Sequence, residues 1–181
     1  LADKLIEIIQ PDRLVLMVFG KGRGKIMNRV IRTRYGNADD AESISMSMVQ
    51  EASSDGMAIL SYDALADERF KHKQSVILNR IRSAMCVPIK SRDEVLGVIY
   101  VDTHITAGRF SEEDLQFLSI IANQSGIALQ NAALYEDLDD LFTGSLKTLV
   151  ATIEAKDPIT SGHSIRVTAY SLAIGRELGL N

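Results

Sequence analysis

The first forty residues alternate between helical and strand-like apolar patterns. Residues 1–10 carry apolar side chains at helical spacing and predict an amphipathic helix. The apolar face of that helix comprises Leu1, Leu5, Ile8 and Ile9. Residues 13–20 form a continuous apolar run, which is typical of a buried strand, and residues 26–35 predict a second strand. The glycine-rich segment 21–25 between them predicts a turn, so the two strands predict a hairpin.

The next sixty residues predict short helices between further strands. Residues 44–54 predict a helix, and its apolar face comprises Ile44, Met48, Val49 and Ala52. Residues 57–63 predict a strand, and the polar stretch 63–75 predicts a long connection with a helical turn. Residues 82–89 and 94–102 predict two more strands. Both alternating sets of the last strand are mostly apolar, so we expect both faces of the sheet to be covered.

Helical patterns occupy the rest of the chain. Ser111 has the character of an N-cap, with Asp114 three residues later as its partner, and starts a helix predicted to run over 111–157. A second short helix is predicted to follow and to end near Gly179. Apolar or small side chains form a row along one side of this predicted long helix. The row comprises Leu118, Ile121, Ala128, Ala132, Tyr135, Leu138, Phe142, Leu146, Leu149 and Ile153.

Composition and charge narrow the class of protein. The 181 residues are 46% hydrophobic and 24% charged, with a net charge of −4, which is the wrong balance for binding a phosphate backbone. We therefore expect no nucleic-acid partner. No apolar run reaches the ~18 residues of a membrane span. The single cysteine, Cys86, fits a reducing compartment, so we expect a cytoplasmic protein with Cys86 in the core. Because residue 1 is leucine, we expect the chain to be part of a longer protein.

Three stretches in order resemble a bacterial signalling GAF domain. They are SISMSMVQEASSDGMAILSYDALADERF, IRSAMCVPIKSRDEVLGVIYVDT and FSEEDLQFLSIIANQSGIALQNAALYEDL. The resemblance extends over residues 1–137. It implies an α+β fold, with a five- or six-stranded antiparallel sheet and helices on both sides. It also implies a small-molecule sensor or a dimerisation module.

The resemblance does not name a ligand. Bilin-binding members use a Cys-His pair, whereas Val87 follows Cys86. Members that bind cyclic nucleotides carry an Asn-Lys pair that is missing here. Haem stays open because His72 and His104 are present, although nothing in the sequence supports either as its ligand.

The segment LKTLVATIEAKDPITSGHSIRVTAYSLAIGRELGLN, residues 146–181, resembles the start of an HD-GYP domain. That family hydrolyses cyclic di-GMP with metals held by histidines and aspartates. His163 matches its first metal-ligating histidine. The later metal ligands of the family are not in this sequence, so we expect no active site and no cofactor within these residues. Ile159 stands where three-metal members have glutamate, which implies two divalent metals, iron or manganese, in the parent protein.

The pattern and the two resemblances together divide the chain. Residues 1–137 are the expected sensory domain, 138–157 a connecting helix and 158–181 the start of the HD-GYP domain. A ligand of the first domain is expected to lie between residues 44–54, 57–62, 63–80 and 94–102. Ligand pockets hold a few polar groups among apolar ones. The candidates for those polar groups are Tyr62, Asp63, Arg82 and Asp102.

A parallel homodimer through helices 111–157 is expected, because beyond about Tyr135 no globular surface is left to cover the apolar row. The near-heptad spacing suits a left-handed supercoil. One alternative is a dimerisation module that binds no ligand, in which Met46, Met57, Met85 and Tyr100 fill the pocket. Another is the sensor of a transcription regulator, with a DNA-binding tail at 158–181.

Overall fold

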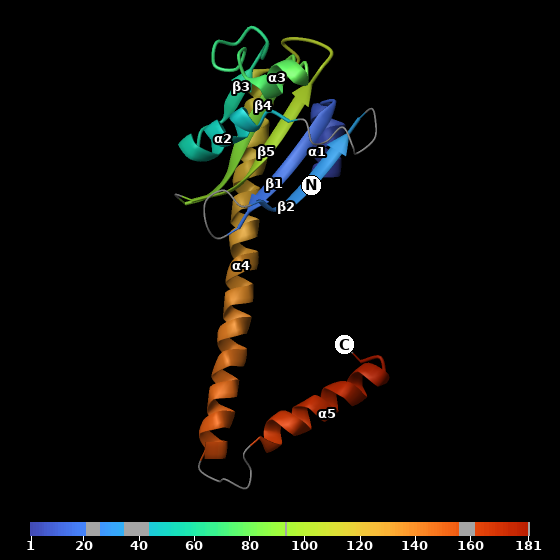
Figure 1. Ribbon diagram of the computed structural model, residues 1–181, viewed down its shortest axis with the longest axis vertical. Helices are drawn as coiled ribbons and strands as arrows, with labels where there is room; N and C mark the ends of the chain where they lie inside the picture. The colour runs from blue at the N-terminus through green and yellow to red at the C-terminus, as the bar shows by residue number, and fades with distance from the viewer. Residues whose placement is uncertain (21–25, 35–43, 93, 156–161, 181) are drawn as a thin grey trace. The chain divides into compact units, whose positions relative to one another are not determined.

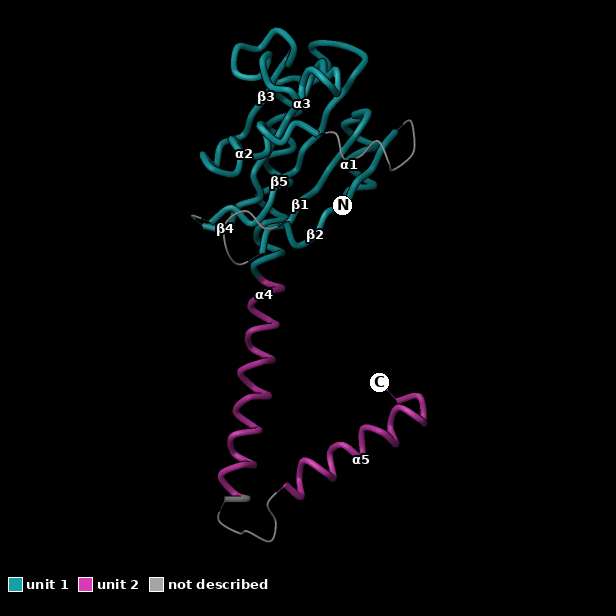
Figure 2. Tube along the Cα trace, in the orientation of Figure 1, with its two compact units in different colours: residues 1–130 teal, residues 131–181 magenta. Residues whose placement is uncertain are grey.

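The computed structural model describes residues 1–181 except 21–25, 35–43, 93, 156–161 and 181 (Figure 1). Its strands are β1 (Arg13–Phe19), β2 (Ile26–Thr33), β3 (Ile59–Ser61), β4 (Ser83–Ser91) and β5 (Glu94–Thr103). Its helices are α1 (Ala2–Ile9), α2 (Met46–Asp55), α3 (Gln74–Leu78), α4 (Glu112–Ala155) and α5 (His163–Glu177). The contacts divide the chain into two compact units, Leu1–Gln130 and Asn131–Asn181 (Figure 2).

The first unit is built on one antiparallel sheet with the strand order β2-β1-β5-β4-β3. The described strands therefore form the expected α+β sheet. β1 and β5 pair along their lengths, and their register sets Arg13 opposite Asp102 and Val15 opposite Tyr100. Gly97 is required in β5, because an added Cβ would lie 2.1 Å from the carbonyl oxygen of Met17 in β1.

Both faces of the sheet are covered, as the alternating pattern of the last strand predicted. The face under α1 and the first turns of α4 buries Ala2, Leu5, Ile9, Leu14, Met85, Val87, Ile89, Ile99, Val101, Phe110, Leu118 and Ala122. The opposite face lies under α2, α3 and the connection between β3 and β4. Each strand residue thus serves one of two separate apolar layers, which is why both of its alternating sets are apolar.

The apolar face predicted for the first helix is partly wrong. α1 buries Ala2, Leu5 and Ile9, which follow one another at spacings of three and four residues. Leu1 and Ile8 are 57% and 61% exposed. The stripe through Ala2, Leu5 and Ile9 faces the sheet, and Ile8, which is adjacent to Ile9 in the chain, points about 100° away from Ile9 around the helix.

The other predicted elements of the first unit are present, with some boundaries moved. The predicted strand 57–63 contains the three residues of β3, and the connection after it contains α3. α2 buries Met48, Val49 and Ala52 and ends at Gly56, whose φ of 62° is left-handed. The predicted turn at 21–25 lies outside the described residues.

α4 begins as predicted and packs closely on the sheet. The Ser111 hydroxyl accepts a hydrogen bond from the Asp114 amide at 3.2 Å, and the Asp114 carboxylate accepts one from the Ser111 amide at 2.9 Å. This reciprocal pair satisfies amides that a helix start leaves free. Further along, a Cβ on Gly126 would lie 1.8 Å from the carbonyl oxygen of Lys90. Gly126 therefore allows the helix to approach the β4–β5 hairpin.

The second unit contains the part of α4 after Gln130, and α5. α5 begins after Gly162 and buries none of its side chains. The large apolar side chains of this part of α4 are exposed as well: Leu134, Tyr135, Leu138, Leu141, Phe142, Leu146, Leu149 and Ile153. No helix among the described residues is long and apolar enough to cross a bilayer.

Candidate functional site

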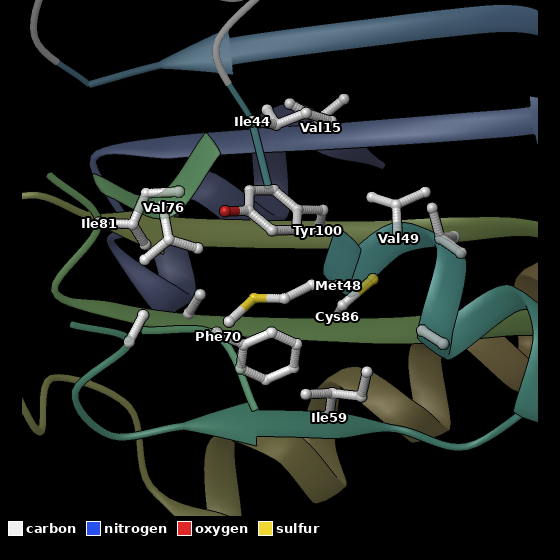
Figure 3. Close-up of a cluster of buried hydrophobic side chains, with 14 of the residues drawn as sticks. Val15, Ile44, Met48, Val49, Ile59, Phe70, Val76, Ile81, Cys86 and Tyr100 are labelled. Atoms are coloured by element: carbon white, nitrogen blue, oxygen red, sulfur yellow. The ribbon is translucent and has the colours of Figure 1, made fainter. Parts of the chain in front are cut away.

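The sheet face under α2 and α3 is the place where a ligand was expected. Figure 3 shows side chains of the sheet and of the segments that cover it filling the space between them. Phe70, Met48 and Tyr100 lie near the middle of that space. The buried set comprises Val15, Met17, Ile44, Met48, Val49, Ala52, Ile59, Ala64, Phe70, Val76, Ile81, Ala84, Cys86, Val98 and Tyr100. This face therefore carries a packed apolar core.

The four residues expected to fill that space in the non-binding alternative do not gather there. Met46 and Met57 are 41% and 68% exposed, and Met85 belongs to the opposite face. Only Tyr100 lies in the expected layer. Neighbouring side chains on a strand point to opposite faces, so Met85 and Cys86 lie on opposite faces of the sheet.

Cys86 is a core residue, as its position in an apolar strand predicted. It is buried on the α2 face, and burial raises the pKa of its thiol. A protonated, enclosed thiol is a poor nucleophile. The role of Cys86 in the described structure is packing.

Asp102 holds the one buried ion pair among the described residues. Its side chain is fully buried, and that of Arg13 is 4% exposed. Arg13 Nε donates to Asp102 Oδ1 at 3.2 Å, and the second guanidinium nitrogen bonds Oδ2. The Tyr100 hydroxyl donates to Asp102 Oδ2 at 2.8 Å. Breaking such a pair from one side leaves an uncompensated buried charge.

Burial and neighbouring charges hold Arg13 and Tyr100 in their protonated forms. Burial is the largest single influence on Arg13 and lowers its pKa, but the charge and hydrogen bond of Asp102, together with Tyr100, outweigh burial and raise it. Burial, reinforced by the Asp102 charge, raises the pKa of Tyr100 well above its usual value of 10.0. Tyr100 therefore stays a phenol that can donate to Asp102. The Ser45 amide in turn donates to the Tyr100 oxygen at 3.5 Å, which links the cluster to the start of α2.

Asp63 and Arg82 form a second, more exposed pair at the same end of the sheet. A terminal guanidinium nitrogen of Arg82 donates to Asp63 Oδ2 at 3.0 Å, and their side chains are 39% and 30% exposed. The Arg82 amide also donates to the Thr103 carbonyl at 2.9 Å, next to Asp102. The Nε of Arg82 is buried without a hydrogen-bond partner among the described residues.

Tyr62 lies at the surface and connects two elements. It is 51% exposed, and its hydroxyl donates to Glu112 Oε1 at 3.1 Å, in the first turn of α4. Its carbonyl accepts the Gly108 amide at 2.6 Å. The predicted site residues thus gather near one end of the sheet in three settings: buried, half-buried and exposed.

The sequence prediction missed the partners of Asp102. Arg13 is the first residue of the apolar strand β1 and Asp102 comes near the end of β5, and both are charges inside otherwise buried runs. Two such opposite charges are expected to pair, because an unpaired buried charge is strongly destabilising. That signal was available, but only the β1–β5 register shows that the two residues are opposite each other.

His104 extends the same cluster toward the surface. Its Nε2 lies 3.6 Å from Asp102 Oδ1, and its Nδ1 lies 2.7 Å from the Asn79 carbonyl at the end of α3. Its amide donates to Asp12 Oδ2 at 2.9 Å. His104 therefore joins the ends of α3 and β5.

The connection after β3 is held by another charged cluster. Arg69 donates to both carboxylate oxygens of Asp67, at 3.0 and 2.8 Å, and the Ser61 hydroxyl donates to Asp67 at 2.8 Å. The hydrogen bond from Arg69 is the main reason that the pKa of Asp67 falls to about 2. Arg69 also reaches the Leu60 carbonyl at 3.0 Å. These bonds fix the segment that inserts Phe70 into the core.

His163 is the first residue of α5 and is exposed. Among the described residues, no group of three or more histidine, cysteine, aspartate or glutamate side chains is placed to hold a metal ion. The expectation of two metals in the parent protein depended on Ile159, which lies outside the described residues.

Comparison with known proteins identifies the first unit. The curated relatives include "Hybrid signal transduction histidine kinase G" of Dictyostelium discoideum, 25% identical over 118 residues, or 65% of this chain and 3% of that protein. "Dual 3',5'-cyclic-AMP and -GMP phosphodiesterase 11" of Drosophila melanogaster is 40% identical over 76 residues, or 41% of this chain and 5% of that protein. The chain thus matches only a small part of each.

Solved structures share the fold. A GAF domain of Synechocystis in its photoproduct state superposes with a TM-score of 0.61 at 16% identity, covering 76% of this chain and 93% of that one. The GAF domain/HD domain protein from Geobacter sulfurreducens gives a TM-score of 0.54 at 11% identity, covering 74% and 89%. The family model of the GAF domain matches residues 1–129, most of the chain. The chain therefore belongs to the GAF domain family.

Proposed function

We propose that this chain is the sensory part of a cytoplasmic signalling protein, in which the GAF domain controls an HD-GYP phosphodiesterase that hydrolyses cyclic di-GMP. The observation that carries the proposal is the order of two signatures in one chain. The GAF unit is followed by residues 146–181, which resemble the start of an HD-GYP domain and place His163 at the beginning of α5. The Geobacter GAF/HD protein supports this combination of domains.

The residues present do not by themselves fit a metal centre. Hydrolytic metal sites need several protein ligands and an open position for water. His163 offers a single imidazole, and no wider ligand group stands among the described residues. The proposal therefore assigns His163 as one ligand of a two-metal centre, of iron or manganese, whose other ligands belong to the parent protein. We derive no catalytic step through it.

Control of the second domain requires a connection from the sensor to the output helix. Tyr62 supplies one, because its hydroxyl bonds Glu112 in the first turn of α4 and its carbonyl holds the loop before that helix. A ligand that displaces the connection after β3 would act on α4 through these bonds. In the proposed parallel homodimer through helices 111–157, such a change would shift the paired helices between two states.

The enzymatic proposal is tested on His163 in the parent protein. His163→Ala should abolish hydrolysis of cyclic di-GMP and lower bound iron or manganese, measured by nucleotide chromatography and elemental analysis. His72→Ala is the matched control, because His72 is an exposed histidine of the GAF unit and should leave both unchanged. Full activity of His163→Ala would refute the assignment of this residue.

A second candidate function is a GAF module that dimerises and binds no ligand. The packed side chains on the α2 face favour it, because Phe70, Tyr100 and Met48 occupy the expected ligand position (Figure 3). The unpartnered Nε of Arg82 favours the sensor instead. Native mass spectrometry of the purified chain distinguishes them. A co-purified small molecule that Arg82→Gln releases supports the sensor, and a ligand-free mass supports the second candidate.

A further inference from the structure

Three exposed aliphatic side chains stand on two neighbouring segments at one end of the sheet. Ile77 and Leu78 are the last residues of α3, and their exposed fractions are 51% and 70%. Ile105, in the loop after β5, is 69% exposed. Val76 of the same helix is fully buried, so α3 turns one apolar side chain inward and two outward. The three exposed side chains are named the α3 patch.

A close contact holds the two segments of the α3 patch side by side. The Nδ1 of His104 lies 2.7 Å from the carbonyl oxygen of Asn79. These two residues are the chain neighbours of Ile105 and Leu78. Figure 1 shows the loop after β5 passing beside α3. Apolar side chains that are brought together in this way mark an interaction surface, whereas isolated exposed ones are ordinary.

Hydrogen bonds also order both segments in the chain by itself. The Ile105 amide donates to Thr103 Oγ1 at 3.3 Å. The Thr103 hydroxyl donates in turn to Asp12 Oδ2 at 2.8 Å. The Arg80 amide donates to the Ile77 carbonyl at 3.2 Å and closes the turn that follows α3. A surface that is already ordered loses little conformational entropy when a partner binds.

The chain around α3 is strongly basic, although the whole protein has a net charge of −4. Residues 69–82 contain five arginines and lysines and no acidic residue. Three of the five form ion pairs with acidic residues of the preceding connection: Arg69 with Asp67, Lys71 with Glu68 and Arg82 with Asp63. The other two, Lys73 and Arg80, are exposed and pair with no acidic side chain within the described part of the chain.

We propose that the α3 patch binds an acidic amphipathic segment of another protein, in which apolar side chains are flanked by aspartate or glutamate. The apolar residues of that segment cover the α3 patch, and its carboxylates pair with the two remaining cations. Lys73 directly precedes α3 and Arg80 follows its end, so the cations flank the apolar residues along the chain. Complementary charge of this kind selects an acidic partner over a basic one.

A membrane surface matches this part of the molecule less well than a protein segment. Exposed apolar side chains beside cations also attract anionic lipids. However, the same end of the sheet carries exposed carboxylates. Glu68 is 83% exposed, and Glu112 accepts a hydrogen bond from Tyr62. The Tyr62 carbonyl in turn accepts the amide of Gly108, in the loop that holds Ile105. A flat anionic surface would meet these carboxylates together with the patch, whereas a narrow segment contacts the patch alone.

Fluorescence anisotropy with a labelled synthetic helix tests the charge and apolar character of the partner. The probe is an amphipathic peptide of about five helical turns, with leucines on one side and glutamates on both flanks. The matched peptide has lysine in place of every glutamate. The full chain should bind the acidic peptide with a micromolar Kd and the lysine peptide at least about 10-fold more weakly. Equal binding of the two peptides, or binding of neither, would overturn the proposal.

Apolar variants locate the binding site. Leu78→Ser with Ile105→Ser should raise the Kd of the acidic peptide about 10-fold or more, because the variant removes two of the three apolar contacts. Met57→Ser is the matched control, since Met57 is 68% exposed and lies before β3, outside the α3 patch. It should leave the Kd within about two-fold. A loss of affinity that is the same in both variants would overturn the assignment to the α3 patch.

Charge variants test the cations with matched backbones. Arg80 and Arg92 are both exposed and both have a left-handed φ, of 49° and 54°, so glutamate strains the two positions alike. Arg80→Glu should raise the Kd of the acidic peptide about 5-fold or more at low salt, and less at high salt. Arg92 lies between β4 and β5, at the end of β4 away from α3, so Arg92→Glu should leave the Kd unchanged. Equal effects of the two substitutions would overturn the role of Arg80.

Two further measurements exclude the other occupants of the α3 patch. The full chain should not co-sediment with vesicles of phosphatidylcholine and phosphatidylglycerol, and Leu78→Ser with Ile105→Ser should leave its self-association unchanged in sedimentation velocity. Vesicle binding that this double variant abolishes would overturn the proposal in favour of a membrane. Weaker self-association of the double variant would overturn it in favour of a second copy of the chain.

Discussion

The two halves of α4 have similar apolar content and opposite surroundings. Before Gln130, Leu118 and Ala122 are buried on the sheet, and Gly126 touches the Lys90 backbone. After Gln130, the leucine and aromatic side chains of the helix stay exposed, including Leu138, Phe142 and Leu149. The difference shows that an apolar pattern along a helix does not by itself tell which surface the apolar side chains pack against. In the first half the chain supplies the partner, and in the second half we propose that another copy does.

The largest effect should come from the buried ion pair of the GAF unit. Arg13→Ala should lower the free energy of unfolding by about 3–5 kcal/mol, because Asp102 would stay buried without its counter-charge. Chemical denaturation followed by near-ultraviolet circular dichroism of the tyrosines measures this. Lys147→Ala, a cation in the exposed half of α4, is the control and should change stability by less than about 0.5 kcal/mol.

The double variant Arg13→Met with Asp102→Leu sharpens that test. Removing both charges together should recover most of the lost stability, since no charge is left unpaired. A double variant as unstable as Arg13→Ala would mean that packing, or the Tyr100 hydroxyl left without its acceptor, dominates over charge at this position.

Truncating one leucine in each half of α4 tests the comparison directly. Leu118→Ala should cost about 2–5 kcal/mol because Leu118 is fully buried. Leu149→Ala should leave the unfolding of the GAF unit within about 0.5 kcal/mol and weaken self-association instead. Hydrogen exchange of the sheet amides measures the loss of stability in Leu118→Ala. Sedimentation velocity measures the weaker self-association of Leu149→Ala. Equal losses of sheet protection would contradict the proposed division.

The two glycines of α4 should respond with opposite signs. Gly126→Ala should destabilise the GAF unit by about 1–3 kcal/mol, because its Cβ would meet the Lys90 backbone. Gly144 has open space around it, so Gly144→Ala should stabilise the helix by up to about 1 kcal/mol. Thermal unfolding followed by circular dichroism compares them. A neutral Gly126→Ala would show that α4 can move away from the hairpin at little cost.

The smallest expected effect is a pH dependence confined to the GAF unit. The pKa of Asp67 is about 2 in the folded protein, below its ordinary 3.8, so its contribution is complete above pH 4 and is lost as the pH falls from about 4 to 2. Arg69 is half exposed and solvent weakens the pair, so Asp67→Asn should cost about 1 kcal/mol at neutral pH. Denaturation at a series of pH values should show a shallower acid dependence in Asp67→Asn, and an unchanged one in the control Asp140→Asn.

Much of the fold could be predicted from local patterns. The strands 13–20, 82–89 and 94–102, the Ser111–Asp114 cap and the two-sided alternation of β5 all appear in the structure. Each depends on residues within a few positions of one another, so the signal is complete within a short window of sequence. The same holds for Gly56, whose left-handed conformation ends α2.

The candidate site was less predictable from the same information. Asp102 was selected as a polar residue near a strand end, but its partner Arg13 is 89 residues away in the chain. Ile8 was assigned to the buried face of its helix and is exposed, because the sheet covers only the stripe through Leu5 and Ile9. Gly126 lies inside the predicted long helix, and only the structure shows its close approach to the Lys90 backbone.

The sequence by itself determined where helices and strands form, where several of them end and which strand carries apolar residues on both faces. Only the tertiary structure decided which charges meet inside the sheet and which glycine a neighbouring backbone requires. The physical reason is range. Periodicity, caps and turns are interactions between near neighbours in the chain, whereas burial and ion pairing depend on strand register, which brings residues such as Arg13 and Asp102 together.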